Sequence, residues 1–269
     1  MSVNRAWWDE RAGLHGKDRV YDTAGFLAGS SRLRQLEIEV AGGVHGQDVV
    51  HLQCHTGMDT LSWLRAGAGT VTGVDFSGVA VEKARQTAAA AGYAGRASFV
   101  QADAVAVPVG LQDRFDVCVA TYGVLEWIGD VPAWMRSAAG LLRRGGRLVV
   151  VDFHPLLQMA ETVDPLCLCF PYANDGPRRF GDQRGSYAVP DAPTQANEVE
   201  QYAHSLGEIV TAAANAGLRV EHLGEHVDAE INPHGVLTAG PDGRHRWQID
   251  GELLPVLYSL GARKLPPDG

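Results

Sequence analysis

The chain has 269 residues, of which 45% are hydrophobic and 20% are charged, the balance of a globular protein with a sizeable core. Its formal net charge of −9 at pH 7 gives no electrostatic basis for binding nucleic acid or an anionic membrane. We find no apolar run near the ~20 residues that cross a bilayer, no signal-peptide core at the start, and too few cysteines for a disulfide scaffold. These features predict a cytoplasmic protein.

Residues 1–46 precede the first predicted core strand. Ser30 and Ser31 are suitable caps for a helix that runs from residue 32 to residue 40. Aromatic residues lie among charged ones in this segment. Two interpretations stay open, namely a helical addition that covers the sheet edge and a lid that closes over a bound ligand.

Residues 48–75 have the order strand, glycine turn, helix, strand, acid. Apolar residues 49–52 predict a short buried strand, Gly57 predicts a turn, and a helix begins near Thr60. A second strand at 70–74 ends at Asp75, close to the roughly 20-residue offset of an acid that binds ribose hydroxyls. This order predicts a nucleotide-binding half-fold.

The remaining elements continue the alternation of strands and helices. We predict helices at 77–91, from 131 to about 142, and at 205–216, where Ser205 and Glu208 form a capping-box pattern. The predicted strands are 98–101, 115–121, 147–153, 218–226 and 253–264. Together they predict an α/β fold with a doubly wound, seven-stranded, mostly parallel sheet.

The segment 154–203 after the fifth strand has a different composition. It carries many prolines, no strong periodicity, and three arginines at 178, 179 and 184. Connections of this length are usually functional or disordered, and its aromatic residues argue against disorder. We predict an insertion that covers a substrate, in which these arginines either clamp a carboxylate or phosphate or remain surface charges.

Two stretches carry a resemblance to a known family. His-Leu-Gln-Cys-His-Thr-Gly-Met-Asp-Thr at 51–60, followed by Val-Thr-Gly-Val-Asp-Phe-Ser at 71–77, resembles the first two motifs of the class I S-adenosylmethionine-dependent methyltransferases. Leu-Leu-Arg-Arg-Gly-Gly-Arg-Leu at 141–148 resembles the segment before strand five in that family. The first motif departs from the usual acid-x-Gly-x-Gly-x-Gly, because His51, Gln53 and His55 replace the acid and two glycines, and only Gly57 remains.

The resemblance implies a Rossmann-like methyltransferase fold in a single domain, with S-adenosylmethionine as cofactor. Residues 47–153 and 204–264 would form the cofactor-binding core, residues 1–46 a helical lid, and residues 154–203 the substrate-covering insertion. Asp103 would hydrogen-bond the adenine amino group, although a turn acid is the alternative. The implied cofactor residues are Tyr21, Phe26, Cys54, His55, Gly57, Met58, Asp75, Phe76, Asp103, Ala104 and Thr121. The expected substrate residues are Tyr122, Arg178, Arg179, Arg184 and Tyr187, whereas Glu126 is expected to be a solvated charge and Trp127 a packing residue.

Methyl transfer from a sulfonium is a displacement that mainly requires alignment and exclusion of water. A hydroxyl or amine acceptor also needs a base, for which His154 and His204 are candidates, with a structural role as the alternative for each. A carboxylate acceptor needs no base, and the three arginines favour a small acidic metabolite methylated on a carboxyl or hydroxyl oxygen. Strand four carries no pair of acids that would indicate a metal site. Cys167 and Cys169 lack the spacing and the second pair of cysteines of a zinc site.

Three functions remain open from the sequence. The first is methylation of a small molecule on oxygen, with nitrogen as an alternative. The second is a nicotinamide-dependent oxidoreductase, which would favour the three-glycine turn that this chain lacks. The third is a non-catalytic cofactor-binding or scaffold protein. We expect no nucleic-acid or membrane partner, and the sequence leaves open monomer and homodimer.

Overall fold

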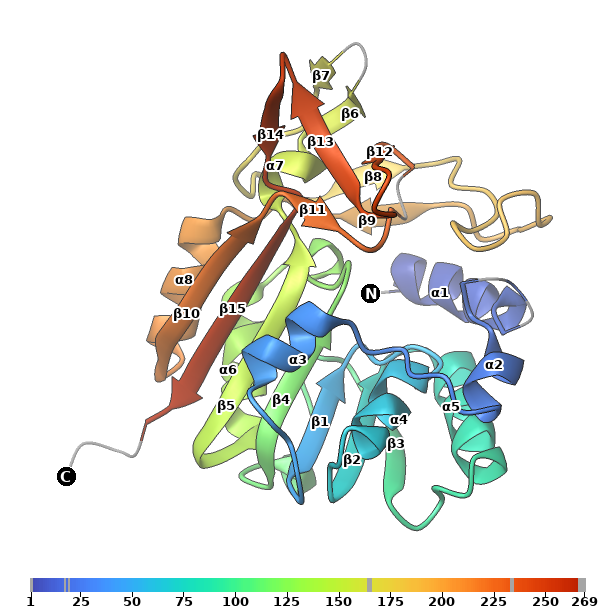
Figure 1. The fold of residues 1–269 in the computed structure, drawn as a ribbon, viewed down its shortest axis with the longest axis vertical. Helices are drawn as coiled ribbons and strands as arrows, with labels where there is room; N and C mark the ends of the chain where they lie inside the picture. Colours follow the sequence, from blue (N-terminus) through green and yellow to red (C-terminus); the bar gives the residue numbers. More distant parts are fainter. Residues whose placement is uncertain (1, 17, 19, 164–165, 233–234, 266–269) are drawn as a thin grey trace.

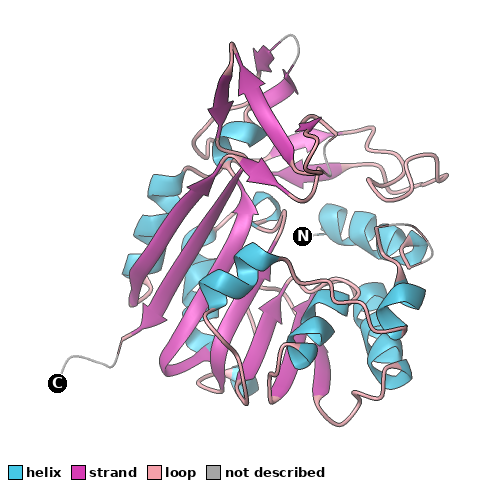
Figure 2. Cartoon of the chain, in the orientation of Figure 1, coloured by secondary structure: helices cyan, strands magenta, loops and turns pink. Residues whose placement is uncertain are grey.

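The computed structural model describes residues 2–16, 18, 20–163, 166–232 and 235–265. Its centre is a seven-stranded sheet with the order β10-β15-β5-β4-β1-β2-β3, covered by helices on both faces (Figures 1 and 2). The strands of this sheet are β1 (Asp48–Leu52), β2 (Thr70–Asp75), β3 (Ala97–Gln101), β4 (Phe115–Thr121), β5 (Leu142–Phe153), β10 (Leu218–His226) and β15 (Leu257–Lys264). The predicted α/β fold with a doubly wound, mostly parallel sheet is confirmed.

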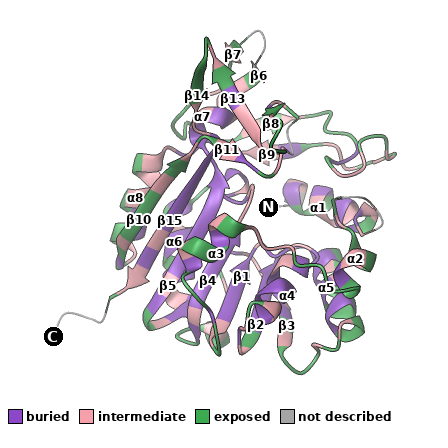
Figure 3. Ribbon diagram, viewed as in Figure 1, coloured by how far each residue is buried: buried purple, intermediate pink, exposed green. Residues whose placement is uncertain are grey.

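Alternate residues of the central strands supply two separate cores. Val49 and Val117 pack with helices α4 (Met58–Arg65) and α5 (Gly78–Ala90) on one face, where α3 (Gln35–Ala41) also lies. Val50 and Cys118 pack with α6 (Val131–Leu141) and α8 (Leu206–Asn215) on the other face. Because both faces are covered, the central strands β1, β2 and β4 are buried along most of their length (Figure 3).

The antiparallel strand predicted to close the sheet is β15, which pairs antiparallel with both β5 and β10. It begins at Leu257, so the predicted strand of 253–264 is four residues too long at its start. Residues Glu252–Leu254 instead form β14, which pairs with β13 (His245–Ile249). Pro255 separates the two strands, since proline has no N–H to donate to a ladder.

Two inserted segments extend the carboxyl end of the sheet. After β5 come α7 (Pro155–Gln158), the hairpin β6 (Ala160–Val163) with β7 (Leu166–Leu168), and the antiparallel pair β8 (Arg178–Phe180) with β9 (Val199–Gln201). Between β10 and β15 lie β11 (Asp228–Ala229), β12 (Thr238–Ala239), β13 and β14. The sequence predicted the first insertion and missed the second, whose strands of two to five residues carry too little alternation to detect.

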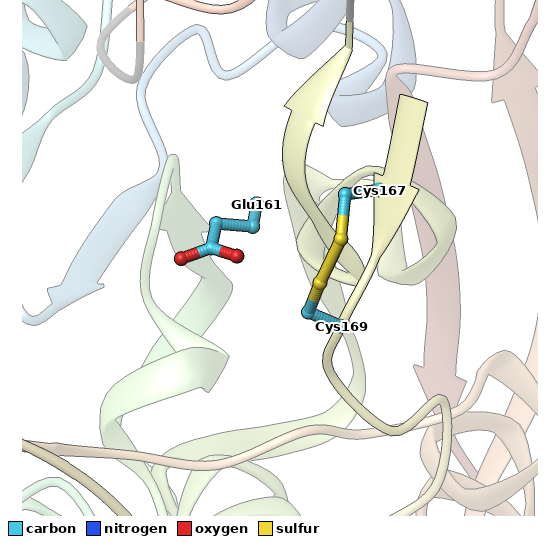
Figure 4. A group of neighbouring side chains, drawn as sticks. All are labelled: Glu161, Cys167 and Cys169. Carbon is cyan, nitrogen blue, oxygen red and sulfur yellow. A yellow bond between two sulfur atoms is a disulfide. The ribbon is translucent and has the colours of Figure 1, made fainter. Parts of the chain in front are cut away.

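The β6–β7 hairpin carries a disulfide between Cys167 and Cys169, with Glu161 beside it (Figure 4). These three side chains are the one group among the described residues whose ligand atoms lie close enough together to hold a metal ion. Because the two sulfur atoms bond to each other, they offer no thiolate to a metal in this structure.

The first 46 residues form three helices with two different locations: α1 (Ser2–Leu14), α2 (Thr23–Leu27) and α3. In Figure 1, α1 lies near the carboxyl ends of the strands, below the β8–β9 arm, whereas α3 lies across the face of the sheet. The predicted helix of 32–40 begins only at Gln35, because the Glu37 carboxylate accepts from the Arg34 backbone N–H at 3.0 Å. Only part of the segment 1–46 therefore has the position of a lid.

Side-chain caps begin the helices at the amino ends that the sequence indicates. Ser77 accepts from Ala80 N at the start of α5, and Ser205 accepts from Glu208 N at the start of α8, both at 3.1 Å. The Glu208 carboxylate does not complete a capping box and lies 3.2 Å from the His204 ring instead. No helix in the described part of the chain combines the length and the apolar character needed to cross a membrane.

Candidate functional site

A cavity of about 810 Å³ lies over the carboxyl ends of β1, β2, β4 and β5. Its floor is the loop 53–57 after β1, the acid that ends β2, and the residues that follow β4. Its cover comes from α1, from the loop 183–190 of the first insertion, and from residues 231–232 of the second. Ligands bind at this edge in open α/β sheets.

The loop after β1 keeps a glycine-like backbone without two of the expected glycines. Gln53, His55 and Gly57 have φ values of 55°, 48° and 78°, all in the left-handed region. The Gln53 amide donates to Val124 O at 2.8 Å and accepts from the Trp134 indole at 3.0 Å. Side-chain hydrogen bonds therefore offset the roughly 1–2 kcal/mol that a left-handed conformation costs a residue with a Cβ.

Gly57 is the position where a side chain cannot be accommodated. A Cβ there would lie 2.6 Å from the Phe99 ring and 2.7 Å from the Ala84 methyl group. The close approach brings α4, which begins after Gly57, against β3 and α5. The glycine that the sequence retains is therefore required by packing as well as by its φ value.

Asp75 lies on the cavity wall at the end of β2. Its carboxylate accepts from His55 N at 2.8 Å and from Ser77 N at 2.9 Å, which fixes its orientation. Burial raises the pKa of Asp75 to about 6, and these two backbone hydrogen bonds oppose the shift. Each oxygen of a carboxylate has two lone pairs, so both retain capacity to accept from a ligand.

Three buried polar atoms of the cavity walls have no hydrogen-bond partner in the described parts of the chain: His51 Nε2, Arg32 Nε and Asp59 Oδ1. The last two lie 3.7 Å apart. The His51 ring is held through Nδ1 by Thr60 Oγ1 at 3.0 Å, and burial lowers the pKa of His51 to about 4. A neutral imidazole and a loosely paired ion pair are thus available to a polar ligand.

Helix α1 and the first insertion are joined through Arg11. This fully buried guanidinium donates to the carbonyl groups of Gln183, Gly185 and Ala196 and to the side chains of Thr194 and Asn197. The neighbouring Glu10 carboxylate accepts from Gln195 N and Ala196 N. Helix α1 and residues 183–197 therefore form one cover.

An aromatic cluster closes the cavity where this cover meets the loop after β1. His15 and His55 share a hydrogen bond of 2.8 Å between Nδ1 and Nε2, and His15 stacks on Tyr21 with ring centroids 4.4 Å apart. The Tyr21 and Tyr187 hydroxyls are hydrogen-bonded to each other. Burial lowers the pKa of His15 to about 4, so the cluster is uncharged at neutral pH.

The far half of the cavity is lined by Tyr122, Gly123 and Glu126 after β4 and by Phe153 at the end of β5. The Arg34 guanidinium lies 4.7 Å from the centre of the Tyr122 ring. Glu126 is 7% exposed, so the expectation of a solvated charge is wrong. Trp127 stacks on Trp7 with ring centroids 5.6 Å apart, and it also lines the cavity.

Most residues expected at the cofactor and substrate sites lie together on the cavity wall. They are Tyr21, Cys54, His55, Gly57, Met58, Asp75, Phe76, Thr121, Tyr122, Arg184 and Tyr187. Seven others do not line it, namely Phe26, Ala104, Asp103, His154, His204, Arg178 and Arg179.

Phe26, Asp103 and Ala104 have structural environments. Phe26 is fully buried, with the Arg65 guanidinium 3.8 Å from its ring centre, and Ala104 belongs to the core on the α6 face. Asp103 accepts from Val105 N at 3.1 Å, which is the turn role that the sequence left open. The structure therefore gives none of the three a contact with the cavity.

The two histidines expected as bases also lie away from the cavity. His154 caps α7 through Nδ1, which accepts from Leu156 N, and its Nε2 lies 2.9 Å from Glu225. His204 has Nε2 at 2.6 Å from Ile128 O, with its Nδ1 beside Glu208. Since both nitrogens of each ring are bonded within the protein, we correct the assignment to the structural alternative.

The three arginines do not form a clamp. Arg178 packs with its guanidinium 5.0 Å from the Phe170 ring centre, and Arg179 is 78% exposed and paired with Glu200. Arg184 reaches the cavity wall, but its side chain is 74% exposed and paired with Asp182. Arg32 and Arg34 also line the cavity, and the sequence did not predict them because they lie in the segment assigned to a helix.

Part of the chain matches a known family in its sequence. Residues 49–146 match the Methyltransferase domain family. The ubiquinone/menaquinone biosynthesis C-methyltransferase UbiE of Geotalea daltonii is 33% identical over 84 residues, which are 31% of this chain and 35% of that protein. The chain thus spans about a third of the length of this curated relative.

Two solved structures share the fold. An S-adenosylmethionine-dependent methyltransferase from Mesorhizobium loti superposes with a TM-score of 0.60 at 22% identity, covering 88% of this chain and 99% of that one. The geranyl diphosphate C-methyltransferase of Streptomyces coelicolor superposes with a TM-score of 0.57 at 11% identity, covering 86% and 78%. Residues 49–146 therefore match a methyltransferase domain, and the chain as a whole shares its fold with solved S-adenosylmethionine-dependent methyltransferases.

Proposed function

We propose that this chain transfers the methyl group of S-adenosylmethionine to a small molecule bound over the ends of β4 and β5. The observation that carries the proposal is one continuous cavity that has Asp75 and the loop 53–57 at one end and an aromatic-walled space at the other. Its volume of about 810 Å³ lies within the roughly 300–1,000 Å³ of pockets that bury a small-molecule ligand.

The adenosyl group fits the end of the cavity over β1 and β2. The Asp75 carboxylate would accept from the ribose hydroxyls, since it is anchored by two backbone N–H groups with its remaining lone pairs free. Tyr21, Phe76 and Met58 would supply apolar contacts, with Cys54, His55, Gly57 and Thr121 around them. The cofactor would supply an electrophilic methyl group and leave as S-adenosylhomocysteine.

The amino-acid tail of the cofactor fits the unpartnered polar atoms beside α4. The tail carries one ammonium and one carboxylate, and Asp59 and Arg32 present one charge of each sign with atoms that lack partners in the described chain. His51 Nε2 would add a third hydrogen bond. This assignment also explains why Arg32 and Asp59 stay 3.7 Å apart without a close ion pair.

The acceptor space favours an aromatic or apolar body over a strongly acidic one. The arginines expected to bind an acid do not meet in the cavity, and Arg34 is balanced by Glu37 and Glu230 nearby. We therefore propose transfer to a hydroxyl oxygen in preference to a carboxylate. Transfer to carbon or nitrogen is the alternative, and the Geotalea daltonii relative is named as a C-methyltransferase.

Titration calorimetry tests the proposal directly. We expect S-adenosylmethionine and S-adenosylhomocysteine to bind the purified chain at one site in the micromolar range, and NAD to give no heat at the same concentrations. Tighter binding of NAD than of S-adenosylmethionine would support the oxidoreductase alternative. Sulfonium binding without methyl transfer to any phenol, amine or carboxylic acid would favour a non-catalytic protein.

A further inference from the structure

We propose that Glu126 is the base that removes a proton from the methyl acceptor, so that the acceptor presents an uncharged hydroxyl or amine on an aromatic or apolar body. This inference rests on the proposed methyl transfer. It adds a catalytic residue and a substrate class to that function.

Glu126 lies in the short 3-10 helix η2 (Leu125–Trp127), which directly follows β4 and the loop 122–124. It is buried, yet it contributes to the cavity wall. A Cβ built on Gly123 would lie 3.4 Å from Glu126 Oε1 and 3.5 Å from the Phe153 ring. The carboxyl group is thus next to the exits of β4 and β5, where we place the acceptor.

The loop that carries Glu126 is rigidly held by Asp152. This buried carboxylate accepts from the backbone N–H groups of Gly123, Val124, Leu125 and Phe153. Both Asp152 oxygens are therefore occupied by backbone donors, and Asp152 is not among the residues that line the cavity. Its effect is to fix the exits of β4 and β5 relative to each other, and with them the position of Glu126.

Asp152 accepts four hydrogen bonds from backbone N–H groups, whereas none to the Glu126 carboxyl group is found among the described residues. The charged groups that face it are Asp152 on β5 and Arg178 on β8, and Tyr202, which directly follows β9, donates its backbone N–H to Glu126 O. A carboxyl group that is buried, not saturated, and exposed only to a ligand cavity is a feature of acid–base sites.

The electrostatics of the group suit this role. Burial raises the pKa of Glu126 to about 8, the negative charge of Asp152 adds to the increase, and Arg178 opposes it. A base works best when its pKa is near the operating pH. Because a nearby positive charge favours the carboxylate, binding of the cationic cofactor in the same cavity should lower this pKa toward neutrality.

The proton balance is simple. The acceptor R–XH and S-adenosylmethionine give R–X–CH₃, S-adenosylhomocysteine and one proton. The X–H bond breaks, its electron pair forms the bond to the methyl carbon, and the sulfur keeps the electron pair of the bond to its methyl group. A carboxylate oxygen of Glu126 accepts the proton and later releases it to solvent.

Other titratable groups of the cavity are less suited to this step. The His51 ring is held by Thr60 and lies with the loop after β1, where we place the amino-acid tail. The pKa of Tyr122 is strongly raised by burial and by Glu37, which makes its hydroxyl a donor. Glu37 accepts from Arg34 N and does not belong to the cavity wall.

Infrared difference spectroscopy tests the assignment without turnover. Wild type minus Glu126→Gln should show the C=O band of a protonated carboxyl group at pH 6 that disappears with a midpoint near pH 8. Addition of S-adenosylmethionine should lower the midpoint by about one unit or more, and S-adenosylhomocysteine, which lacks the sulfonium charge, should lower it less. The absence of this band in wild type would overturn the proposal, and so would a pH midpoint that S-adenosylmethionine does not change.

Methylation of two phenols tests the chemistry. With labelled S-adenosylmethionine at pH 8, 4-methylphenol is neutral and needs a base, whereas 4-nitrophenol is largely ionised and does not. Glu126→Gln should reduce turnover of 4-methylphenol by about 10²–10⁴-fold and that of 4-nitrophenol far less. Equal losses for the two phenols, or wild-type turnover of carboxylic acids alone, would contradict the inference.

Calorimetry separates this inference from the proposed function. Glu126→Gln should bind S-adenosylmethionine as wild type does, and Glu198→Gln, an exposed change on the covering segment, should match wild type in every assay. Failure of wild type to bind the sulfonium would remove the proposed function itself. Normal binding with no carboxyl band from Glu126 would remove only the role of this residue.

Discussion

The two halves of the cavity are built in different ways. The half over β1 and β2 is made of residues that directly follow two neighbouring strands, and its polar groups are fixed by backbone contacts, as with Asp75. The half over β4 and β5 has walls from segments far apart in the sequence, including Tyr122 and Ile231.

This difference indicates that the floor of the cavity tolerates changes elsewhere, whereas its walls depend on a few contacts. A floor made of strand ends is held by the sheet itself, so changes in the cover leave it in place. A wall made of inserted segments depends on a few long-range contacts such as those of Arg11. Four substitutions test this difference, from a collapse of the floor to a change that should be nearly neutral.

Gly57→Val should have the largest effect, because it alters the floor at its tightest point. The Cβ would overlap the Phe99 ring and the Ala84 methyl group, and φ is 78°. Overpacking and the left-handed conformation together should cost about 2–5 kcal/mol of unfolding free energy. Urea denaturation measures this loss, and calorimetry should show no cofactor binding.

The control for this change is Gly92→Ala, since a Cβ at Gly92 has nothing within 4 Å and φ there is 75°. It isolates the backbone cost, which should be about 1–2 kcal/mol with cofactor binding retained. If the two variants lost equal stability, crowding at Gly57 would not be a feature of the site.

Arg11→Met should separate the cover from the floor. It removes donors from three carbonyl groups and two side chains while keeping an apolar side chain beside Trp7. We expect the free energy of unfolding to fall by about 2–4 kcal/mol, because the carbonyl groups left without a donor are partly buried. Limited proteolysis should cut residues 183–197 faster than in wild type, while the core of the sheet resists.

Arg5→Met is the matched control on the same helix. Arg5 is half exposed and lies 3.9 Å from Asp9, a surface pair that should contribute less than about 1 kcal/mol. An Arg11→Met protein with wild-type protease resistance at 183–197 would contradict the view that the lid and the insertion form one cover.

Asp75→Asn tests the floor with a side chain of the same size, in which an NH₂ group replaces one of the two oxygens that accept from His55 N and Ser77 N. The amide removes the charge that would accept from the ribose hydroxyls, and hydrogen bonds to charged groups contribute about 1.5–3 kcal/mol. Calorimetry should therefore show S-adenosylmethionine binding weakened by about 10–100-fold. Asp103→Asn, outside the cavity, should bind within about threefold of wild type, and the reverse order would exchange the two assignments.

The same difference between the halves decides how far the sequence could predict the structure. Strands such as 115–121 and caps such as Ser77 are local features, because they depend on apolar runs and on hydrogen bonds within one turn. The position of Asp75 followed from the order of these elements. Most of the floor could therefore be predicted.

Side-chain positions that depend on contacts between distant segments could not be predicted in the same way. His154 and His204 have the right chemistry for a base, but their hydrogen bonds to Glu225 and to Ile128 O arise from segments more than 70 positions away in the sequence. The burial of Glu126 likewise depends on β9, which arrives from the far end of the insertion. Such positions follow from tertiary packing, for which a single sequence carries no local signal.

Gln53→Gly should have the smallest effect, and it tests why the first motif tolerates the loss of its glycines. Glycine would relieve the left-handed backbone at φ 55°, a gain of about 1–2 kcal/mol. It would also remove the hydrogen bonds to Val124 O and from the Trp134 indole, at about 0.5–1.5 kcal/mol each. These effects nearly cancel, so urea denaturation should differ from wild type by less than about 1 kcal/mol. Gln53→Ala keeps the strain and loses both bonds, so it should be less stable than Gln53→Gly, and equal stability of the two would show that the backbone at this position is not strained.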